Sequence, residues 1–158
     1  MFFFGQYEHT IDAKQRLAIP TDARAVLDAA GNGSTFVVAP GTSDSICLWP
    51  ERTFTELAQA SLGGSFLGDA RLVEFQRAIF SQAQRCPMDS AGRIRLPERL
   101  LSQYGLSGSV MVVGAMDHLE VIDPGKWNDK QVTGSAYDDM LQEARQAVAA
   151  KQRGGSDS

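Results

Sequence analysis

The stretch IDAKQRLAIP, residues 11–20, recurs 77 residues later as MDSAGRIRLP, residues 88–97. In both copies an aspartate, an arginine, two aliphatic residues and a closing proline keep their places. Each copy runs into a helical pattern that a glycine ends, and two short apolar strands follow it. The helical patterns cover residues 21–30 and 98–104, and the strands cover 36–39, 46–49, 110–114 and 119–122. This shared order indicates a tandem duplication of one β-turn-β-α-β-β unit.

A unit of this size cannot bury its own apolar face, because about 50 residues with four short strands leave too little interior. We therefore expect the two units to interleave their strands into one small barrel or sandwich. Amphipathic spacing predicts a helix over residues 69–84 and another over 136–151, with a disordered tail after Lys151. The predicted organisation is a first domain at 1–56, connecting helices at 57–82, a second domain at 83–126, and a C-terminal helix and tail at 127–158.

Charge is unevenly spread along the 158 residues. The chain carries 15 Lys and Arg against 19 Asp and Glu, a formal net charge of −4, which by itself argues against a general polyanion binder. From Arg85 to Arg99, however, four arginines face only Asp89 and Glu98. From Asp117 onward there are 8 acidic and 5 basic residues. Cations therefore gather near the repeated motif, and the acidic excess lies towards the C-terminus.

The sequence offers little sign of enzyme, metal or membrane chemistry. Cys47 and Cys86 are isolated, and His9 and His118 lie far from both in the chain, so we expect no metal, no cofactor and no disulfide. Both histidines are interpreted as hydrogen-bonded strand residues. The chain has no glycine-rich phosphate loop and no nucleophile elbow, and no apolar run reaches the roughly 18 residues that span a bilayer. The start of the chain lacks the cationic region of a signal peptide, so we expect neither catalysis nor a membrane partner.

The repeated Asp-x-x-x-Arg motif is where binding chemistry could lie. An aspartate that opens a tight turn can accept backbone N–H bonds from residues two or three ahead, and the arginine then pairs with it. This describes Asp12 with Arg16 and Asp89 with Arg93. One interpretation is a purely structural hairpin held by an ion pair. The alternative is a nucleic-acid contact, since arginines fit phosphates and guanine edges bidentately.

Neighbouring cations favour the nucleic-acid alternative. Lys14 lies in the first turn, and Arg95 follows Arg93 on the second strand. Strand alternation places Arg93 and Arg95 on one face and turns Ile94 and Leu96 inward. The candidate DNA-binding residues are Lys14, Arg16, Arg93 and Arg95, with Asp12 and Asp89 as structural motif residues.

Three segments resemble the MraZ family of bacterial transcription regulators: MFFFGQYEHTIDAKQRLAIP (1–20), ARLVEFQRAIFSQAQRCPMDSAGRIRLP (70–97) and VMVVGAMDHLEVID (110–123). The resemblance covers roughly residues 1–150. It implies an α+β fold in which two tandem AbrB-like swapped-hairpin units form a small β-barrel with flanking helices. It also implies a ring-shaped homo-oligomer, for which we expect eight or twelve subunits.

The resemblance also implies a function. Members of the family bind short direct repeats of double-stranded DNA in the promoter of the division and cell wall gene cluster, and mostly repress it, which places them in the cytoplasm at the nucleoid. The family's motif positions fall on Asp12, Lys14, Arg16, Asp89 and Arg93. Because its turn is more basic, we expect the first copy to be the main DNA reader. An AbrB-like antitoxin, or a protein-interaction scaffold of the same barrel class, is the alternative.

One position departs from the family pattern. Gln15 stands where members usually have glycine before the first motif arginine, whereas Gly92 keeps the pattern in the second copy. A residue with a side chain resists positive φ. We therefore expect a somewhat different first turn, with DNA binding retained.

Overall fold

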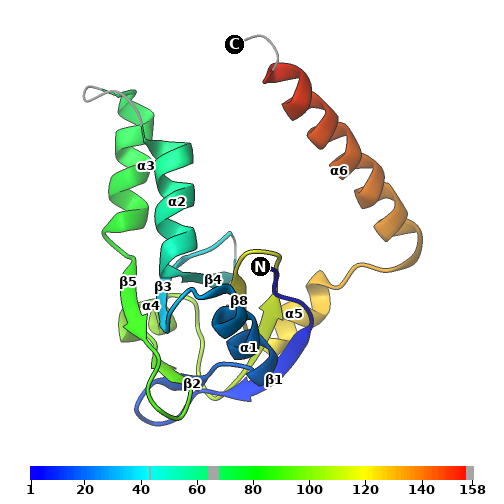
Figure 1. Cartoon of the computed structure of the whole chain (residues 1–158). Coiled ribbons are helices and arrows are strands. Elements are labelled where there is room, and N and C mark those ends of the chain that lie inside the picture. The colour runs from blue at the N-terminus through cyan, green and yellow to red at the C-terminus, as the bar shows by residue number, and fades with distance from the viewer. Residues whose placement is uncertain (43, 64–67, 156–158) are drawn as a thin grey trace. The chain divides into compact units, whose positions relative to one another are not determined.

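The computed structural model describes residues 1–42, 44–63 and 68–155, and within them the chain is mixed α and β (Figure 1). The strands are β1 (Gln6–Thr10), β2 (Arg16–Ala18), β3 (Thr35–Pro40), β4 (Ser45–Pro50), β5 (Gln84–Pro87), β6 (Arg93–Arg95), β7 (Ser109–Gly114) and β8 (Leu119–Ile122). The helices are α1 (Thr21–Ala30), α2 (Glu51–Leu62), α3 (Ala70–Phe80), α4 (Glu98–Gln103), α5 (Pro124–Lys130) and α6 (Gly134–Gly154).

The strands of the two repeats interleave, as the duplication predicts. A six-stranded sheet has the order β1-β7-β8-β4-β3-β5, and β2 pairs with β6 in a separate two-stranded sheet. The pairs β1–β7, β4–β8, β3–β5 and β2–β6 each join a strand of the first repeat to one of the second, and all are antiparallel. The large sheet is open, with β1 and β5 at its edges, so its closure into a barrel stays a prediction.

Matching backbone bonds tie each repeated turn to the other repeat. The amide of Leu96 donates to the carbonyl of Gln15 over 2.8 Å, and the amide of Ile19 donates to the carbonyl of Gly92 over 2.9 Å. These two bonds exchange equivalent positions of the repeat. Neither turn can therefore form its native contacts without the other copy.

The core lies under the two-stranded sheet and against the first two helices of the repeats. Leu17 of β2 and Ile94 of β6, which are direct cross-strand partners, are completely buried. They belong to one cluster with apolar residues of the large sheet and of α1 and α4. Fully burying an aliphatic side chain of this size contributes about 1.5–3 kcal/mol. The expected inward orientation of Ile94 and Leu96 is confirmed.

The helix ends follow the sequence signals at most places. Both α1 and α4 begin directly after a proline, and the chain leaves them through Gly31 and Gly105, which have φ values of +64° and +63°. Helix α3 starts after Asp69, whose carboxylate accepts from the amide of Arg71. The predicted helix over 69–84 is too long, because α3 ends at Phe80 and Gln84 already pairs with β3 as the start of β5.

The chain divides into two compact units, residues 1–127 and 128–158. The second unit holds α6, in which no residue is buried. This helix continues to Gly154, so the expected disorder after Lys151 is wrong for residues 152–154. The remaining tail residues, 156–158, lie outside the described part. Among the described helices, none combines the length and hydropathy required of a membrane span.

Candidate nucleic-acid interface

The first motif folds into a tight turn that its aspartate organises. One carboxylate oxygen of Asp12 accepts the backbone amides of Lys14 and Arg16, each over 2.9 Å. The other accepts from Nε of Arg16 over 2.7 Å. The aspartate therefore bonds residues two and four ahead, rather than two or three ahead as expected, because the arginine already begins β2.

The second motif repeats this geometry. Asp89 accepts the amides of Ala91 and Arg93 over 2.9 and 3.0 Å, and Nε of Arg93 over 3.0 Å. In both turns the residue before the arginine has positive φ: +59° at Gln15 and +75° at Gly92. The expectation of a different first turn is therefore wrong. The surrounding hydrogen bonds hold Gln15 in the left-handed conformation that glycine adopts in the second copy.

The same contacts change the acidity of both aspartates. The hydrogen bond from the Arg16 backbone amide is the main cause that lowers the pKa of Asp12, followed by the Arg16 side chain and the Lys14 amide, while partial desolvation opposes them. Arg93 and Ala91 lower the pKa of Asp89 in the same way. Both carboxylates stay ionised at neutral pH.

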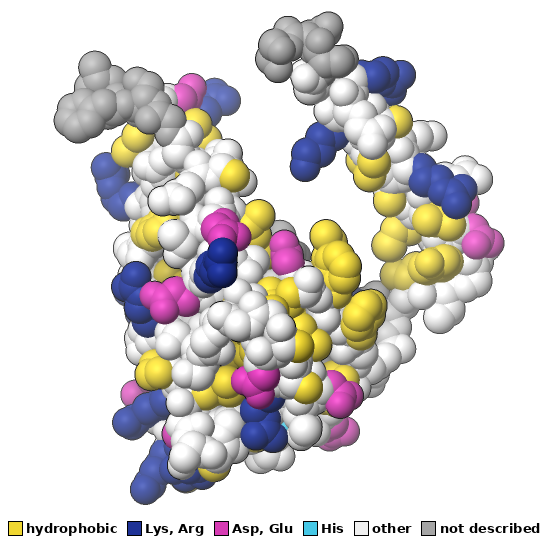
Figure 2. Space-filling model, in the orientation of Figure 1, with side chains coloured by type: hydrophobic (Ala, Val, Ile, Leu, Met, Phe, Trp, Pro, Cys, Tyr) yellow, Lys and Arg dark blue, Asp and Glu magenta, His cyan; other side chains and the backbone are white. Residues whose placement is uncertain are grey.

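Strands β2 and β6, which we call the ribbon, present an apolar face inward and a cationic face outward. Arg16 lies opposite Arg95, and Ala18 lies opposite Arg93. Because cross-strand partners share a face of the sheet, the three arginines share the outer one. Figure 2 shows Lys and Arg side chains gathered at the end of the first unit where Figure 1 places β2.

Two of these arginines are held in place while their outer ends stay open. Arg16 and Arg93 each use Nε to bind their aspartate, and their side chains remain about one third exposed, at 31% and 36%. Within the described residues, the two terminal nitrogens of each guanidinium have no protein partner. A fixed guanidinium that offers two parallel N–H groups suits bidentate contact with a phosphate or a guanine edge.

The other two predicted cations are less constrained. The side chains of Lys14 and Arg95 are exposed and make no hydrogen bond or ion pair within the described part of the chain. All four predicted DNA-binding residues thus lie on the ribbon or in the turn that leads into it. Arg85, also in the arginine-rich stretch, forms an ion pair with Glu51 of α2 instead.

Sequence reasoning did not assign a role to Arg24 of α1. Its guanidinium lies over Gly92: a Cβ atom built on that glycine would come within 2.4 Å of Arg24 Nη1. Nη2 donates to the hydroxyl of Thr21 over 3.2 Å, and Nε is buried without a partner. An arginine of the first repeat therefore covers the turn of the second. The matching position in the second repeat is Leu101, so comparing the copies shows that this arginine is specific to the first.

Fold and site together define a class: a protein of two interleaved copies of one β-α-β unit, whose paired Asp–Arg turns flank a cationic two-stranded ribbon. The family model described as "MraZ protein, putative antitoxin-like" matches residues 2–76 and 79–149. Relatives carry the name "Transcriptional regulator MraZ". The protein from Moorella thermoacetica is 35% identical over 128 residues, covering 80% of this chain and 85% of the relative.

Two further relatives with the same name match over more of the chain. The protein from Lactiplantibacillus plantarum is 30% identical over 141 residues, covering 89% of this chain and 96% of the relative. The protein from Desulforamulus reducens is 31% identical over 142 residues, covering 89% and 95%. The chain belongs to the MraZ family, as the resemblance of its motifs predicts.

Proposed function

We propose that this protein is a transcriptional regulator that binds double-stranded DNA in a sequence-specific manner through the ribbon and its two turns. The observation that carries the proposal is the outer face of the ribbon, where three arginines lie together over a buried apolar face. The names of the relatives support the regulatory part of the proposal.

The ribbon suits the major groove, which is about 12 Å wide and admits a two-stranded β-ribbon. Arg16 and Arg93, each oriented by an aspartate, would read base edges or clamp phosphates with their terminal nitrogens. Lys14 and Arg95 would contact the phosphate backbone, which fixes register without reading sequence. The first turn would be the main reader, because it carries Lys14 where the second carries Ala91.

One subunit offers only these few cations in a chain of net charge −4, so its own affinity for DNA would be weak. We infer that several copies act together as a ring of eight or twelve subunits. Direct repeats in the DNA would engage several copies at once, and the avidity gained can reach about 10²–10⁴-fold. Exposed apolar side chains support self-association: Leu72, Val73, Phe75 and Phe80 on α3, and Tyr137, Met140, Leu141 and Val148 on α6.

The proposed target is the set of short direct repeats in the protein's own promoter, ahead of the division and cell wall gene cluster, and the proposed outcome is repression. Such a protein would work in the cytoplasm at the nucleoid. In this proposal residues 1–56 and 83–126 are AbrB-like domains whose strands close into a small barrel, residues 57–82 connect them, and residues 127–158 serve assembly.

The test is binding of a labelled DNA fragment from upstream of the protein's own gene, measured by fluorescence anisotropy beside a shuffled fragment. We expect tight binding to the first fragment, and a loss of at least tenfold in the double variant Lys14→Ala, Arg16→Ala. Arg52→Ala is the matched control, because it removes an exposed cation that pairs with Glu56 on α2, away from the ribbon. Equal affinity in wild type and double variant would refute the assignment of the ribbon.

A second candidate function is that of an AbrB-like antitoxin or protein-interaction scaffold. The wording "antitoxin-like" in the family model favours it. Light scattering after size exclusion separates the two. A homo-oligomer that shifts to larger mass with the upstream DNA supports the regulator, whereas a monomer that ignores that DNA supports the scaffold.

A further inference from the structure

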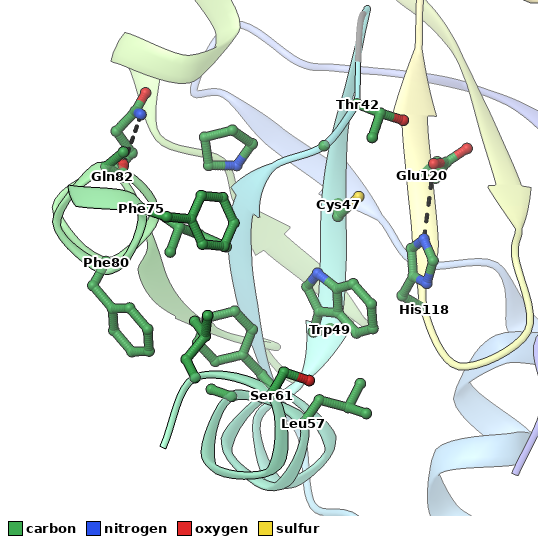
Figure 3. A pocket seen from close by; sticks show the side chains of 17 residues that line it. Thr42, Cys47, Trp49, Leu57, Ser61, Phe75, Phe80, Gln82, His118 and Glu120 are labelled. Atoms are coloured by element: carbon green, nitrogen blue, oxygen red, sulfur yellow. Dashed lines mark hydrogen bonds and ion pairs between the residues drawn. The ribbon is translucent and has the colours of Figure 1, made fainter. Parts of the chain in front are cut away.

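A hollow of about 550 Å³ lies between the α2–α3 hairpin and strands β4 and β8 (Figure 3). Most of its lining is apolar and comes from the two helices, including Phe54, Leu57 and Phe75. Its strand wall is different: Cys47 and Trp49 of β4 stand beside His118 and Glu120 of β8. This polar wall lies apart from the ribbon and plays no part in the proposed DNA contact.

The strand register explains why these residues meet. Cys47 is the direct cross-strand partner of Glu120, and the next pair, Leu48 and Leu119, faces the core and is completely buried. Strand alternation therefore places residues 47 and 49 on the same face as residues 118 and 120. The sequence gives no local sign of this, because Cys47 and His118 come from different repeats.

The cluster has the donors and the supports of a metal site. One ligand atom each from Cys47, His118 and Glu120 lie within 4.8 Å of one another, and His118 Nε2 is 3.8 Å from Glu120 Oε1. The other ring nitrogen, Nδ1, is 2.9 Å from a carboxylate oxygen of Asp117. The Trp49 ring stacks on the imidazole with centroids 4.1 Å apart.

We propose that Cys47, His118 and Glu120 form a zinc-binding site that joins the two repeats. Thiolate, imidazole and carboxylate are the ligands zinc takes in proteins, and a tetrahedral zinc holds its ligand atoms about 3.3–3.7 Å apart. The observed separations require only small side-chain rotations to reach that geometry. Three protein ligands leave a fourth position, which faces the hollow and would take water or a small ligand.

Asp117 and Trp49 act as positioning residues in this site. The carboxylate of Asp117 accepts a proton bond from Nδ1, so the lone pair of Nε2 points at Cys47 and Glu120, as in carboxylate–histidine–zinc arrangements. The stacked indole restricts rotation of the ring. The cluster thus has the second layer of support that a chance meeting of three donors lacks. It departs from the expectation of no metal, which rested on spacing along the chain.

The experiment titrates reduced, untagged, metal-free protein with Co²⁺ and then adds Zn²⁺. We expect one Co²⁺ per chain, a thiolate-to-cobalt charge-transfer band in the near ultraviolet, and loss of that band when Zn²⁺ displaces the cobalt. Cys47→Ser should abolish the band. Cys86→Ser is the matched control: it removes the other thiol, which is buried away from the hollow and whose pKa burial raises to about 11, and it should keep the band.

A second variant guards against a folding defect in Cys47→Ser. Asp117→Asn touches no metal, and it should lower the Zn²⁺ affinity about 10–100-fold by releasing the orientation of His118. Zn²⁺ should also raise the melting temperature of the wild type, because a ligand that binds only the folded state stabilises it. Absence of a thiolate band in the wild type, its persistence in Cys47→Ser, or unchanged Zn²⁺ affinity in Asp117→Asn would each overturn the proposal.

Discussion

Replacing Gln15 by glycine should stabilise the protein. Gln15 has φ +59°, a backbone conformation in which a side chain is disfavoured, whereas its counterpart Gly92 adopts φ +75° without that penalty. The Gln15 side chain offers little in return, since its amide makes only an exposed hydrogen bond of 3.4 Å to the carbonyl of Ala13.

The expected gain follows from two opposing terms. Left-handed backbone costs a residue with a side chain about 1–2 kcal/mol. Glycine in turn loses more conformational freedom on folding, which costs about 0.5–1 kcal/mol. Gln15→Gly should therefore raise the free energy of unfolding by about 0.5–1 kcal/mol, equivalent to roughly 1–4 °C in melting temperature for a chain of this size.

The reciprocal change is the control. Gly92→Gln forces a side chain into φ +75°, and its Cβ would lie 2.4 Å from Arg24 Nη1. We expect a loss of about 1–3 kcal/mol. Urea unfolding of both variants and the wild type, at one fixed protein concentration, measures these changes. A destabilised Gln15→Gly, or a neutral Gly92→Gln, would refute the view that both turns share one strained conformation.

Three further outcomes follow from the ribbon. The pKa values of Asp12 and Asp89 are lowered in the folded state, so their contribution to stability is present above the ordinary Asp pKa and is lost as pH falls through the lower folded value; Asp12→Asn and Asp89→Asn should each flatten the fall in melting temperature across that acid range, and an unchanged slope would contradict the assignment. Leu17→Ala and Ile94→Ala should each cost about 2–5 kcal/mol in urea unfolding, because both side chains are completely buried, and a cost below 1 kcal/mol would mean that the ribbon is not part of the core. Arg95→Ala should weaken binding to specific and shuffled DNA by a similar factor in anisotropy titrations, and a loss confined to the specific fragment would make it a base reader instead.

The repeat made most of the fold predictable from sequence. Positions that match at an offset of 77 residues occupy equivalent places, and buried Leu17 and Ile94 even become cross-strand partners. Strand alternation correctly separated the exposed Arg95 from the buried Leu96. Local rules suffice here because each repeat carries its own turn, helix and stop signals.

Long-range packing explains what could not be predicted. The positive φ of Gln15 is imposed by bonds to Asp12 and by the amide of Leu96, a residue of the other repeat. The end of α3 at Phe80 follows from pairing between β5 and β3. The meeting of Cys47 with His118 depends on the register between β4 and β8. Local propensity contains none of this information.

The salt dependence of promoter binding tests the central claim most directly. Each phosphate contact contributes about 0.9 to the slope of log affinity against log salt concentration. Removing the Lys14 and Arg16 side chains should therefore lower both the affinity for the upstream DNA and the magnitude of that slope by at least about 2, while Arg52→Ala leaves the slope unchanged. An identical slope in the wild type and the double variant would contradict DNA binding through the ribbon.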